Sequence, residues 1–226
     1  NLAEKYQLPV IILTDQHLAS SYATVDPFDL SQVTIDRGLL FSEKKDEHLE
    51  YKRHRITQSG ISPRAFPGLG QALVVTDSDE HDEEGHLTED AEERTSQVQK
   101  RLRKLFSLKQ EISMPWQYGP KKAETTLIGW GSTYGAIHEA VDILHREGAS
   151  INMLHLNELW PLPAEAVTDV VSKAHNSYII ENNATGQLAR LIKAETGCDV
   201  SGWILKYDGR PFTPAYIAEA VRKEGC

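Results

Sequence analysis

Polar residues at the end of a predicted strand are the first candidates for chemistry. Leu8–Asp15 predicts a strand, because Val10–Leu13 is continuously apolar, as in parallel strands buried on both faces. Ligands in open α/β sheets bind beyond the carboxyl ends of strands, so Asp15, Gln16 and His17 could line a site. The alternative is that Asp15 caps a helix that runs through Ser21 and that His17 is simply exposed.

A basic, turn-rich loop is the second candidate. Tyr51–Gly70 is the most basic part of the chain, and it includes Arg53 and Arg64. Arginine suits carboxylates and phosphates through paired hydrogen bonds, and long ordered loops are often functional. These two arginines could therefore hold an anionic substrate or an acidic group of a partner. The alternative is a loop fixed by acidic neighbours or by a partner subunit.

A turn of small residues, Gly131–Gly135, separates an apolar run from an amphipathic helix. Free N–H groups at the start of that helix could hold a phosphate or a carboxylate. The turn lacks the spacing of a dinucleotide fingerprint, and no Walker lysine follows it. The alternative is that the small residues serve a tight turn and close packing on the sheet.

An acidic stretch, Asp77–His86, holds two histidines and six carboxylates. This composition raises the hypothesis of a metal site. The spacing matches neither an EF-hand, with Gly at the sixth and Glu at the twelfth place, nor a His-Glu-x-x-His motif. A solvated acidic loop is the favoured interpretation, and no metal is assigned.

The composition is that of an acidic globular protein. The chain has 226 residues and a net charge of −9, with 40% hydrophobic and 25% charged residues. Nucleic acid is therefore not expected as a main partner, because phosphate neutralisation needs clustered lysine and arginine. No apolar run approaches the ~20 residues that span a bilayer. Two cysteines, Cys198 and Cys226, are too few for a Cys₄ site and fit a reducing cytoplasm.

The C-terminal half predicts alternating strands and helices. Apolar runs and helical periodicity place them as follows: strands at Thr125–Trp130, Ile151–Leu156, Ser177–Ile180 and Trp203–Leu205, and helices at Ser132–Glu147, from Ala164, after Gly186 and from Pro214, the last capped by Thr213. This alternation implies a parallel sheet with helices on both faces.

The N-terminal half is less regular. A strand is predicted at Ala72–Asp77 and a turn-rich linker at Pro115–Pro120, while Glu43–Glu47 is expected to be a solvated connection. A helix is predicted at Thr88–Lys109, capped by Thr88. Its apolar stripe is thin and consists of Val98, Leu102 and Leu105. Because the chain starts at Asn1 in what resembles the end of a helix, we expect a piece of a longer protein or a processed product.

Six segments, taken in order, resemble one known family. They are LPVIILTDQHLASS (8–21), GISPRAFPG (60–68), DEHDEEGHLTED (79–90), GWGSTYG (129–135), ENNATGQL (181–188) and YDGRPF (207–212). The set resembles the α subunit of 2-oxoacid:ferredoxin oxidoreductases over nearly the whole chain. Within that family it is most similar to the 2-oxoglutarate:ferredoxin oxidoreductase branch.

The resemblance implies a thiamine-diphosphate enzyme of α and β subunits. Such an enzyme decarboxylates a 2-oxoacid oxidatively, forms an acyl-CoA and passes electrons through a [4Fe–4S] cluster to ferredoxin. The implied α/β fold is a transketolase-C-terminal-like, Rossmann-like domain at 121–226. It follows a connecting segment at 26–120, with its basic loop, strand and long helix, and the last strand and helix of a pyrimidine-binding domain at 1–25. Asp15, Gln16 and His17 would then approach the pyrimidine side of the cofactor.

Departures from the family pattern limit what this chain could do alone. The family's Tyr-Pro-Ile-Thr-Pro segment, whose threonine contacts the 2-oxoacid, is absent. The Gly-Asp-Gly diphosphate motif and the cluster cysteines belong to the β subunit, and this chain has neither. We therefore assign no catalytic residue and expect the chain alone to be inactive. Its expected role is to complete the active-site wall and to hold a hetero-oligomer with the β subunit.

A second hypothesis, of a different class, stays open. The chain could be a free-standing α/β module that binds a phosphate-bearing ligand at the Gly131–Gly135 turn. Nucleotide or CoA binding by the isolated chain would distinguish this module from a part of an oxidoreductase.

Overall fold

The computed structural model describes residues 1–42, 50–68 and 70–224. The chain divides into two compact units, one formed by Asn1–Ile12 and Val25–Glu111, the other by Leu13–Thr24 and Ile112–Cys226. We call them unit 1 and unit 2. The predicted solvated connection Glu43–Glu47 lies outside the described residues, and so does Cys226.

Unit 2 is built on one five-stranded sheet with the strand order β1-β3-β2-β4-β5. The strands are β1 (Trp116–Tyr118), β2 (Thr125–Trp130), β3 (Ile151–Leu156), β4 (Asn176–Glu181) and β5 (Gly202–Leu205). β2 to β5 are parallel, which confirms the predicted α/β class with a mostly parallel sheet. β1 is an antiparallel edge strand beside β3, so the turn-rich linker predicted at Pro115–Pro120 contains a strand of this sheet.

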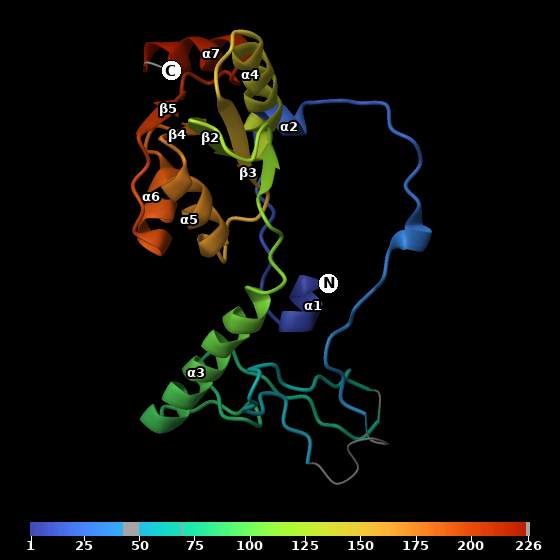
Figure 1. Cartoon of the computed structure of the whole chain (residues 1–226). Coiled ribbons are helices and arrows are strands. Elements are labelled where there is room, and N and C mark those ends of the chain that lie inside the picture. Colours follow the sequence, from blue (N-terminus) through green and yellow to red (C-terminus); the bar gives the residue numbers. More distant parts are fainter. Residues whose placement is uncertain (43–49, 69, 225–226) are drawn as a thin grey trace. The chain divides into compact units, whose positions relative to one another are not determined.

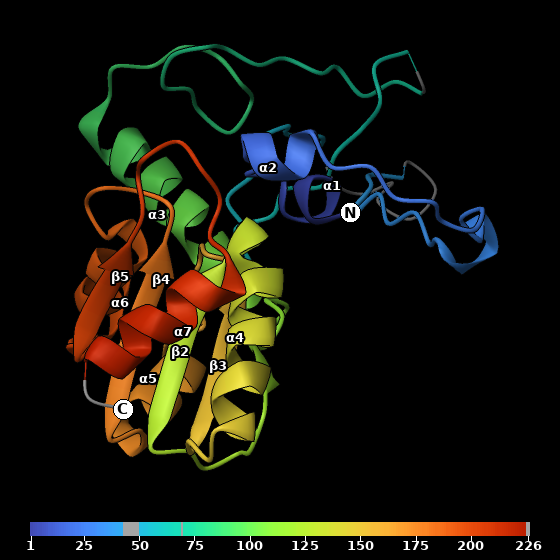
Figure 2. The same ribbon diagram turned by 90° about the horizontal axis from the view of Figure 1, so that it is seen from above.

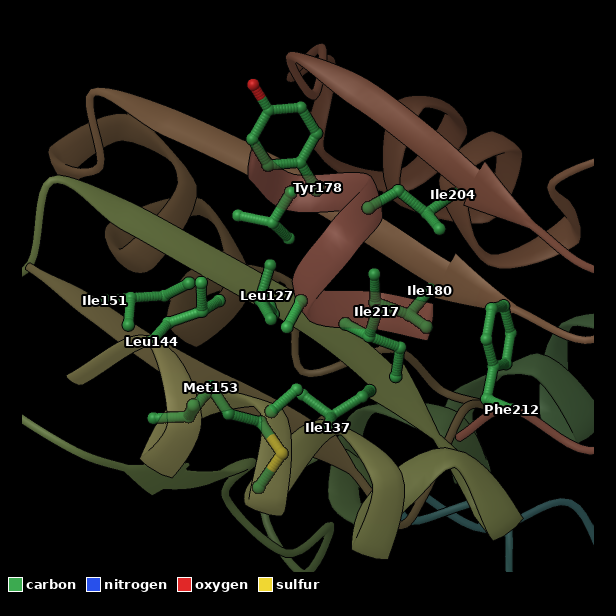
Figure 3. Packing of buried hydrophobic residues seen from close by; sticks show 14 residues of the cluster. Leu127, Ile137, Leu144, Ile151, Met153, Tyr178, Ile180, Ile204, Phe212 and Ile217 are labelled. Carbon is green, nitrogen blue, oxygen red and sulfur yellow. The ribbon is translucent and has the colours of Figure 1, made fainter. Parts of the chain in front are cut away.

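Helices cover both faces of this sheet (Figures 1 and 2). α4 (Tyr134–Arg146) and α7 (Pro214–Lys223) pack on one face, and α5 (Ala164–Lys173) and α6 (Gln187–Thr196) pack on the other. Alternation along β2 sends Leu127 to the first face and Ile128 to the second. Figure 3 shows the first core, where Leu127 packs with residues of α4 and α7 such as Ile137 and Ile217.

The turn between β2 and α4 is tight because its residues are small. A Cβ added at Gly129 would lie 2.3 Å from Ile137 Cδ1 and 2.7 Å from Thr133 Oγ1, so a larger residue there would force these side chains to shift. Gly131–Thr133 forms a 3-10 turn, η2, before α4 begins. At the other end of the chain α7 begins as predicted, since the Thr213 hydroxyl accepts from the Tyr216 N–H at 3.2 Å.

Unit 1 contains α1 (Leu2–Tyr6), the 3-10 turn η1 (Leu30–Gln32), α3 (Ala91–Leu108) and long loops. The predicted strand Ala72–Asp77 is not formed. The cap of α3 is Asp90 and not Thr88, because the Asp90 carboxylate accepts from the Glu92 and Glu93 N–H groups at 2.9 and 2.8 Å. None of the described helices is long and apolar enough to cross a membrane.

The buried face of α3 is polar, contrary to the predicted apolar stripe. Lys100 and Lys104 are buried, whereas Leu102 is 56% exposed. Lys100 Nζ donates to the His54 carbonyl at 2.6 Å, and Lys104 Nζ donates to the Gln7 carbonyl at 3.0 Å. Irregular loops leave carbonyl groups without ladder partners, and these lysines supply the donors.

The predicted strand Leu8–Asp15 is not formed, and this segment pairs with no strand among the described residues. Val10, Ile11, Ile12 and Leu13 are 53%, 80%, 88% and 60% exposed. A strand forms only beside a neighbour that takes its backbone N–H and C=O groups, and the described residues offer none here.

Candidate functional site

A cavity of about 790 Å³ lies in unit 2, at the carboxyl ends of the parallel strands. Gly131, Asn157 and Asn182, which follow β2, β3 and β4, all contribute to its wall. This is the edge at which open α/β sheets bind ligands. The other lining residues come from the region of α2 (Gln16–Ala19), from β1, from the turn η2, from α4, from β3 and from the start of α7. They are His17, Leu18, Ser21, Trp116, Ser132, Tyr134, Gly135, Ala136, Glu139, His155, Pro211, Phe212 and Pro214.

One wall of the cavity belongs to a cluster of five aromatic side chains. The ring centroids of Trp116 and Tyr134 are 5.0 Å apart, and Tyr134 meets His155 edge-on at 5.1 Å. His138 stacks on Tyr118 at 3.7 Å and lies nearly parallel to Trp116 at 6.2 Å. We call these five residues the aromatic cluster. Trp116, Tyr134 and His155 are its members that reach the cavity.

His155 is one of the residues of this site that sequence reasoning missed. It is only 4% exposed, and its Nδ1 has no hydrogen-bond partner among the described residues. Burial lowers the pKa of the imidazole, which therefore stays neutral at pH 7. Its sequence signal was a polar residue near the carboxyl end of an otherwise apolar strand, Ile151–Leu156.

Asp15 lies against the glycine turn within unit 2. Its carboxylate caps α2 by accepting from the Leu18 N–H at 2.9 Å and also accepts a hydrogen bond from the Ser132 hydroxyl. Burial opposes its ionisation, but the bonds from Leu18 and Ser132 outweigh burial and lower the pKa of Asp15. The predicted capping alternative is therefore present for Asp15.

This contact bears on the hypothesis of a phosphate at the Gly131–Gly135 turn. A smaller cavity of about 250 Å³ beside the turn is lined by Asp15 together with Trp130, Ser132 and Asn182. The anion next to the turn is thus a carboxylate of the chain itself, and the Ser132 hydroxyl already serves it.

Gln16 and His17 point to different surroundings. The Gln16 side chain donates to the Ser20 hydroxyl on the next turn, whereas His17 lines the larger cavity. The described residues contain no group of three or more His, Cys, Asp or Glu that could hold a metal ion, so none of them is assigned to a metal.

A neighbouring carboxylate holds the start of α6. Glu181 is fully buried at the end of β4 and accepts from the Leu188 N–H at 2.9 and 3.0 Å and from the Ala189 N–H at 3.3 Å. Trp130 Nε1 and Asn183 Nδ2 also donate to it, at 3.3 and 2.7 Å. A negative charge at a helix N-terminus is favourable, so Glu181 fixes α6 to the sheet.

The two arginines of the basic loop lie in unit 1. Arg64 donates to the Glu4 carboxylate and to the Arg37 carbonyl, the latter at 3.2 Å. Arg53 donates to Gln7 Oε1 at 3.1 Å and forms no ion pair with a carboxylate in the part of the chain that the structure describes.

Arg53 also lies near the buried lysines of α3. Burial, together with the charges of neighbouring cations such as Arg53, lowers the pKa of Lys100 to about 7 and that of Lys104 to about 8. Burial likewise lowers the pKa of the Arg53 guanidinium. Unit 1 thus contains a group of cations held by neutral carbonyl and amide oxygens.

The acidic stretch Asp77–His86 is organised by hydrogen bonds within the chain. Asp82 accepts from the N–H groups of Gly85 and His86 at 2.8 and 2.9 Å. Glu80 accepts two hydrogen bonds from the Arg101 guanidinium, at 3.0 and 2.8 Å. These carboxylates therefore serve a loop conformation and a contact with α3.

Comparison with known proteins gives two family matches along the chain. Residues 1–100 match the family model described as "Pyruvate flavodoxin/ferredoxin oxidoreductase, thiamine diP-bdg". Residues 123–217 match the model described as "Pyruvate:ferredoxin oxidoreductase core domain II".

Individual relatives agree with these models. The α subunit of 2-oxoacid:ferredoxin oxidoreductase 1 from Sulfurisphaera tokodaii is 38% identical over 99% of this chain and 35% of its own length. The pyruvate synthase subunit PorA of Methanothermobacter thermautotrophicus is 28% identical over 91% of this chain and 54% of its own. The chain therefore spans about a third of the length of the first relative.

A solved structure resembles the chain over the same extent. The 2-oxoglutarate:ferredoxin oxidoreductase from Magnetococcus marinus, solved with 2-oxoglutarate, coenzyme A and succinyl-CoA bound, matches with a TM-score of 0.91 and 32% identity. The match covers 99% of this chain and 38% of the other.

Proposed function

We propose that this chain, which belongs to the family of 2-oxoacid:ferredoxin oxidoreductase α subunits, acts as part of such an α subunit. The proposed substrate of the whole enzyme is 2-oxoglutarate. The observation that carries the proposal is the order of the two family matches, which follow one another along nearly the whole chain. The likeness to a structure that holds 2-oxoglutarate supports the choice of substrate.

The proposed reaction is an oxidative decarboxylation. The bond between the carboxylate carbon and the keto carbon of the 2-oxoacid breaks and CO₂ leaves. The acyl group that remains bonds to the sulfur of CoA, the thiol proton is released, and two electrons reduce ferredoxin. A [4Fe–4S] cluster of the β subunit would supply the electron relay between them. Thiamine diphosphate, when bound, supplies the electron sink for the carbon–carbon cleavage.

This chain contributes mainly to structure and assembly in the proposal. The exposed apolar stretch Val10–Leu13 pairs with strands of a pyrimidine-binding domain that are not among the described residues. Residues 1–25 thereby end that domain, 26–120 connect, and 121–226 form the transketolase-C-terminal-like domain. The protein works in the cytoplasm together with a β subunit.

Individual residues keep proposed roles. Asp15 and Gln16 lie at the end of the proposed strand Leu8–Asp15. Their position brings His17 toward the pyrimidine side of the cofactor. Arg64, with Glu4 beside it, orders the basic loop. Arg53, which has no carboxylate partner among the described residues, receives an anion of a substrate or partner.

The alternative of a free-standing phosphate-binding module has less support. The Ser132 hydroxyl of the Gly131–Gly135 turn already donates to the Asp15 carboxylate.

The test is to purify the full-length protein from its host and record what accompanies it. We expect a co-purifying β chain, the brown absorbance of an iron–sulfur cluster and CoA-dependent reduction of ferredoxin with 2-oxoglutarate. A colourless single chain without this activity would overturn the proposal, whereas activity with pyruvate alone would overturn only the choice of substrate.

A further inference from the structure

The larger cavity of unit 2 has the dimensions of a small-molecule site. Its volume of about 790 Å³ lies within the range of roughly 300–1,000 Å³ that is typical of ligand pockets. It is placed at the carboxyl ends of β2, β3 and β4 and is lined by side chains from both sequence-distant parts of unit 2. The proposed oxidoreductase function assigns it no role beyond His17.

The aromatic cluster gives this cavity a wall of aromatic rings. Trp116 is 40% exposed and Tyr134 is 37% exposed, although each packs against other rings of the cluster. The neighbouring rings fix their orientation, so little side-chain entropy is lost when a ligand stacks on them. Planar rings are the ligands that such a wall recognises, because every planar base offers a face for stacking.

Two polar side chains of the cavity lining, Asn157 and His155, could form hydrogen bonds with a ligand. The Asn157 amide, which has donors and an acceptor, lines the cavity and forms no hydrogen bond with the described residues. The buried imidazole of His155 lines it too and lacks a partner for Nδ1. An unpartnered buried nitrogen is rare in folded proteins and points to a missing partner.

The charge of the wall limits the class of ligand. Glu139 is an acidic residue of the lining, and no lysine or arginine belongs to that lining in the described part of the chain. A polyphosphate tail would therefore find no cation to neutralise it. A neutral or singly charged ring compound meets no such obstacle.

We propose that this cavity binds a planar nitrogen heterocycle without a polyphosphate, of the nucleobase or nucleoside class. The heterocycle stacks on Trp116 and presents its polar edge to His155 and Asn157. The proposed function gives no role to Trp116, His155 or Asn157, so the proposal is tested by binding and not by turnover.

The test is equilibrium dialysis of radiolabelled adenosine against the full-length protein in its native complex. We expect saturable binding with a Kd below about 1 mM, weakened at least tenfold by Trp116→Leu and by Asn157→Leu. Trp160→Leu is the matched control, because Trp160 is 60% exposed and does not line the cavity, and it should bind adenosine as the wild type does.

Three outcomes would overturn the proposal. The first is no saturable binding of adenosine by the folded complex. The second is equal binding by wild type and the Trp116→Leu and Asn157→Leu variants, each verified as folded by circular dichroism. The third is at least tenfold tighter binding of ATP than of adenosine, since phosphate recognition would then dominate.

Discussion

The Ser132 hydroxyl, at the start of the turn before α4, donates a hydrogen bond to the carboxylate of Asp15, which also caps α2. The two residues are 117 positions apart in the chain but lie in the same compact unit. The contact fixes the end of the extended segment Leu8–Asp15 to the β2–α4 turn. It therefore sets where His17 enters the larger cavity.

Removing the Ser132 hydroxyl should destabilise unit 2 by about 1 kcal/mol, the net worth of one hydrogen bond. Urea unfolding of Ser132→Ala, followed by tryptophan fluorescence, measures this loss. The loss should vanish in an Asp15→Ala background, because no side-chain acceptor for the Ser132 hydroxyl then remains at position 15. An equal loss in both backgrounds would show that the hydroxyl acts elsewhere.

The contact between Asp15 and Ser132 should make the stability of unit 2 depend on pH in the acid range. Hydrogen bonds from Leu18 and Ser132 lower the pKa of Asp15, so its contribution is present above the carboxyl's ordinary pKa and is lost as the pH falls through the lowered value. The difference in stability between wild type and Ser132→Ala should therefore shrink below about pH 4.

Glu181→Gln should destabilise unit 2 by roughly 2 kcal/mol. The substitution removes a buried carboxylate whose oxygens accept hydrogen bonds from the Leu188 and Ala189 N–H groups of α6. It leaves an amide nitrogen facing these donors. Glu195→Gln on the exposed side of the same helix is the control and should change the unfolding free energy by less than about 0.5 kcal/mol. Equal effects of the two substitutions would contradict this role of Glu181.

The lowered pKa of Lys100 predicts that the free energy of unfolding rises with pH above neutrality. Burial lowers its pKa to about 7 in the folded protein, whereas an unfolded lysine titrates near ~10.4. Between these values the unfolded chain binds more protons, so raising the pH favours the folded state. Thermal unfolding followed by circular dichroism should show a higher midpoint at pH 9 than at pH 7, relative to Lys100→Met.

The control for this prediction is Lys109→Met, at the exposed C-terminal end of α3. It should retain the full wild-type rise between pH 7 and pH 9. If Lys100→Met retains the same rise, the lowered pKa of Lys100 does not govern the effect.

The C-terminal half could be predicted from sequence because its signals are local. Thr125–Trp130 was predicted and found with the same bounds, since a continuous apolar run marks a strand buried on both faces. The extended runs Leu8–Asp15 and Ala72–Asp77 carry a similar signal but form no strand in the described structure. Strand formation depends on a neighbour that the local sequence does not specify.

The polar face of α3 also escaped prediction. Periodicity favours burial of Leu102, yet Lys100 and Lys104 are buried because loop carbonyls of His54 and Gln7 require donors. These contacts join residues 46 and 97 positions apart, so no local pattern contains them.

One residue of the candidate site, His17, could be predicted from the sequence. His17 was predicted at a strand end and does line a cavity. His155 and Trp116 were missed, because they meet only through the pairing of β1 with β3, where Trp116 lies opposite His155. The register of an antiparallel edge strand is a property of the folded sheet.

His17→Ala should lower kcat/KM for 2-oxoglutarate about tenfold in the complete complex, as expected when one hydrogen bond near the cofactor is lost. This prediction depends on the proposed function. The matched control is His175→Ala, since His175 is exposed and lines neither cavity. An active complex in which His17→Ala turns over like wild type would remove His17 from the site.

The central claim is that the chain serves a 2-oxoacid:ferredoxin oxidoreductase. The most direct measurement is the stoichiometry of a single reaction mixture with the full complex, 1-¹³C-labelled 2-oxoglutarate, CoA and ferredoxin. We expect one labelled CO₂ and one succinyl-CoA for each pair of electrons that reaches ferredoxin, and no reduction without CoA. Release of neither CO₂ nor acyl-CoA by an intact complex, with ferredoxin left oxidised, would contradict it.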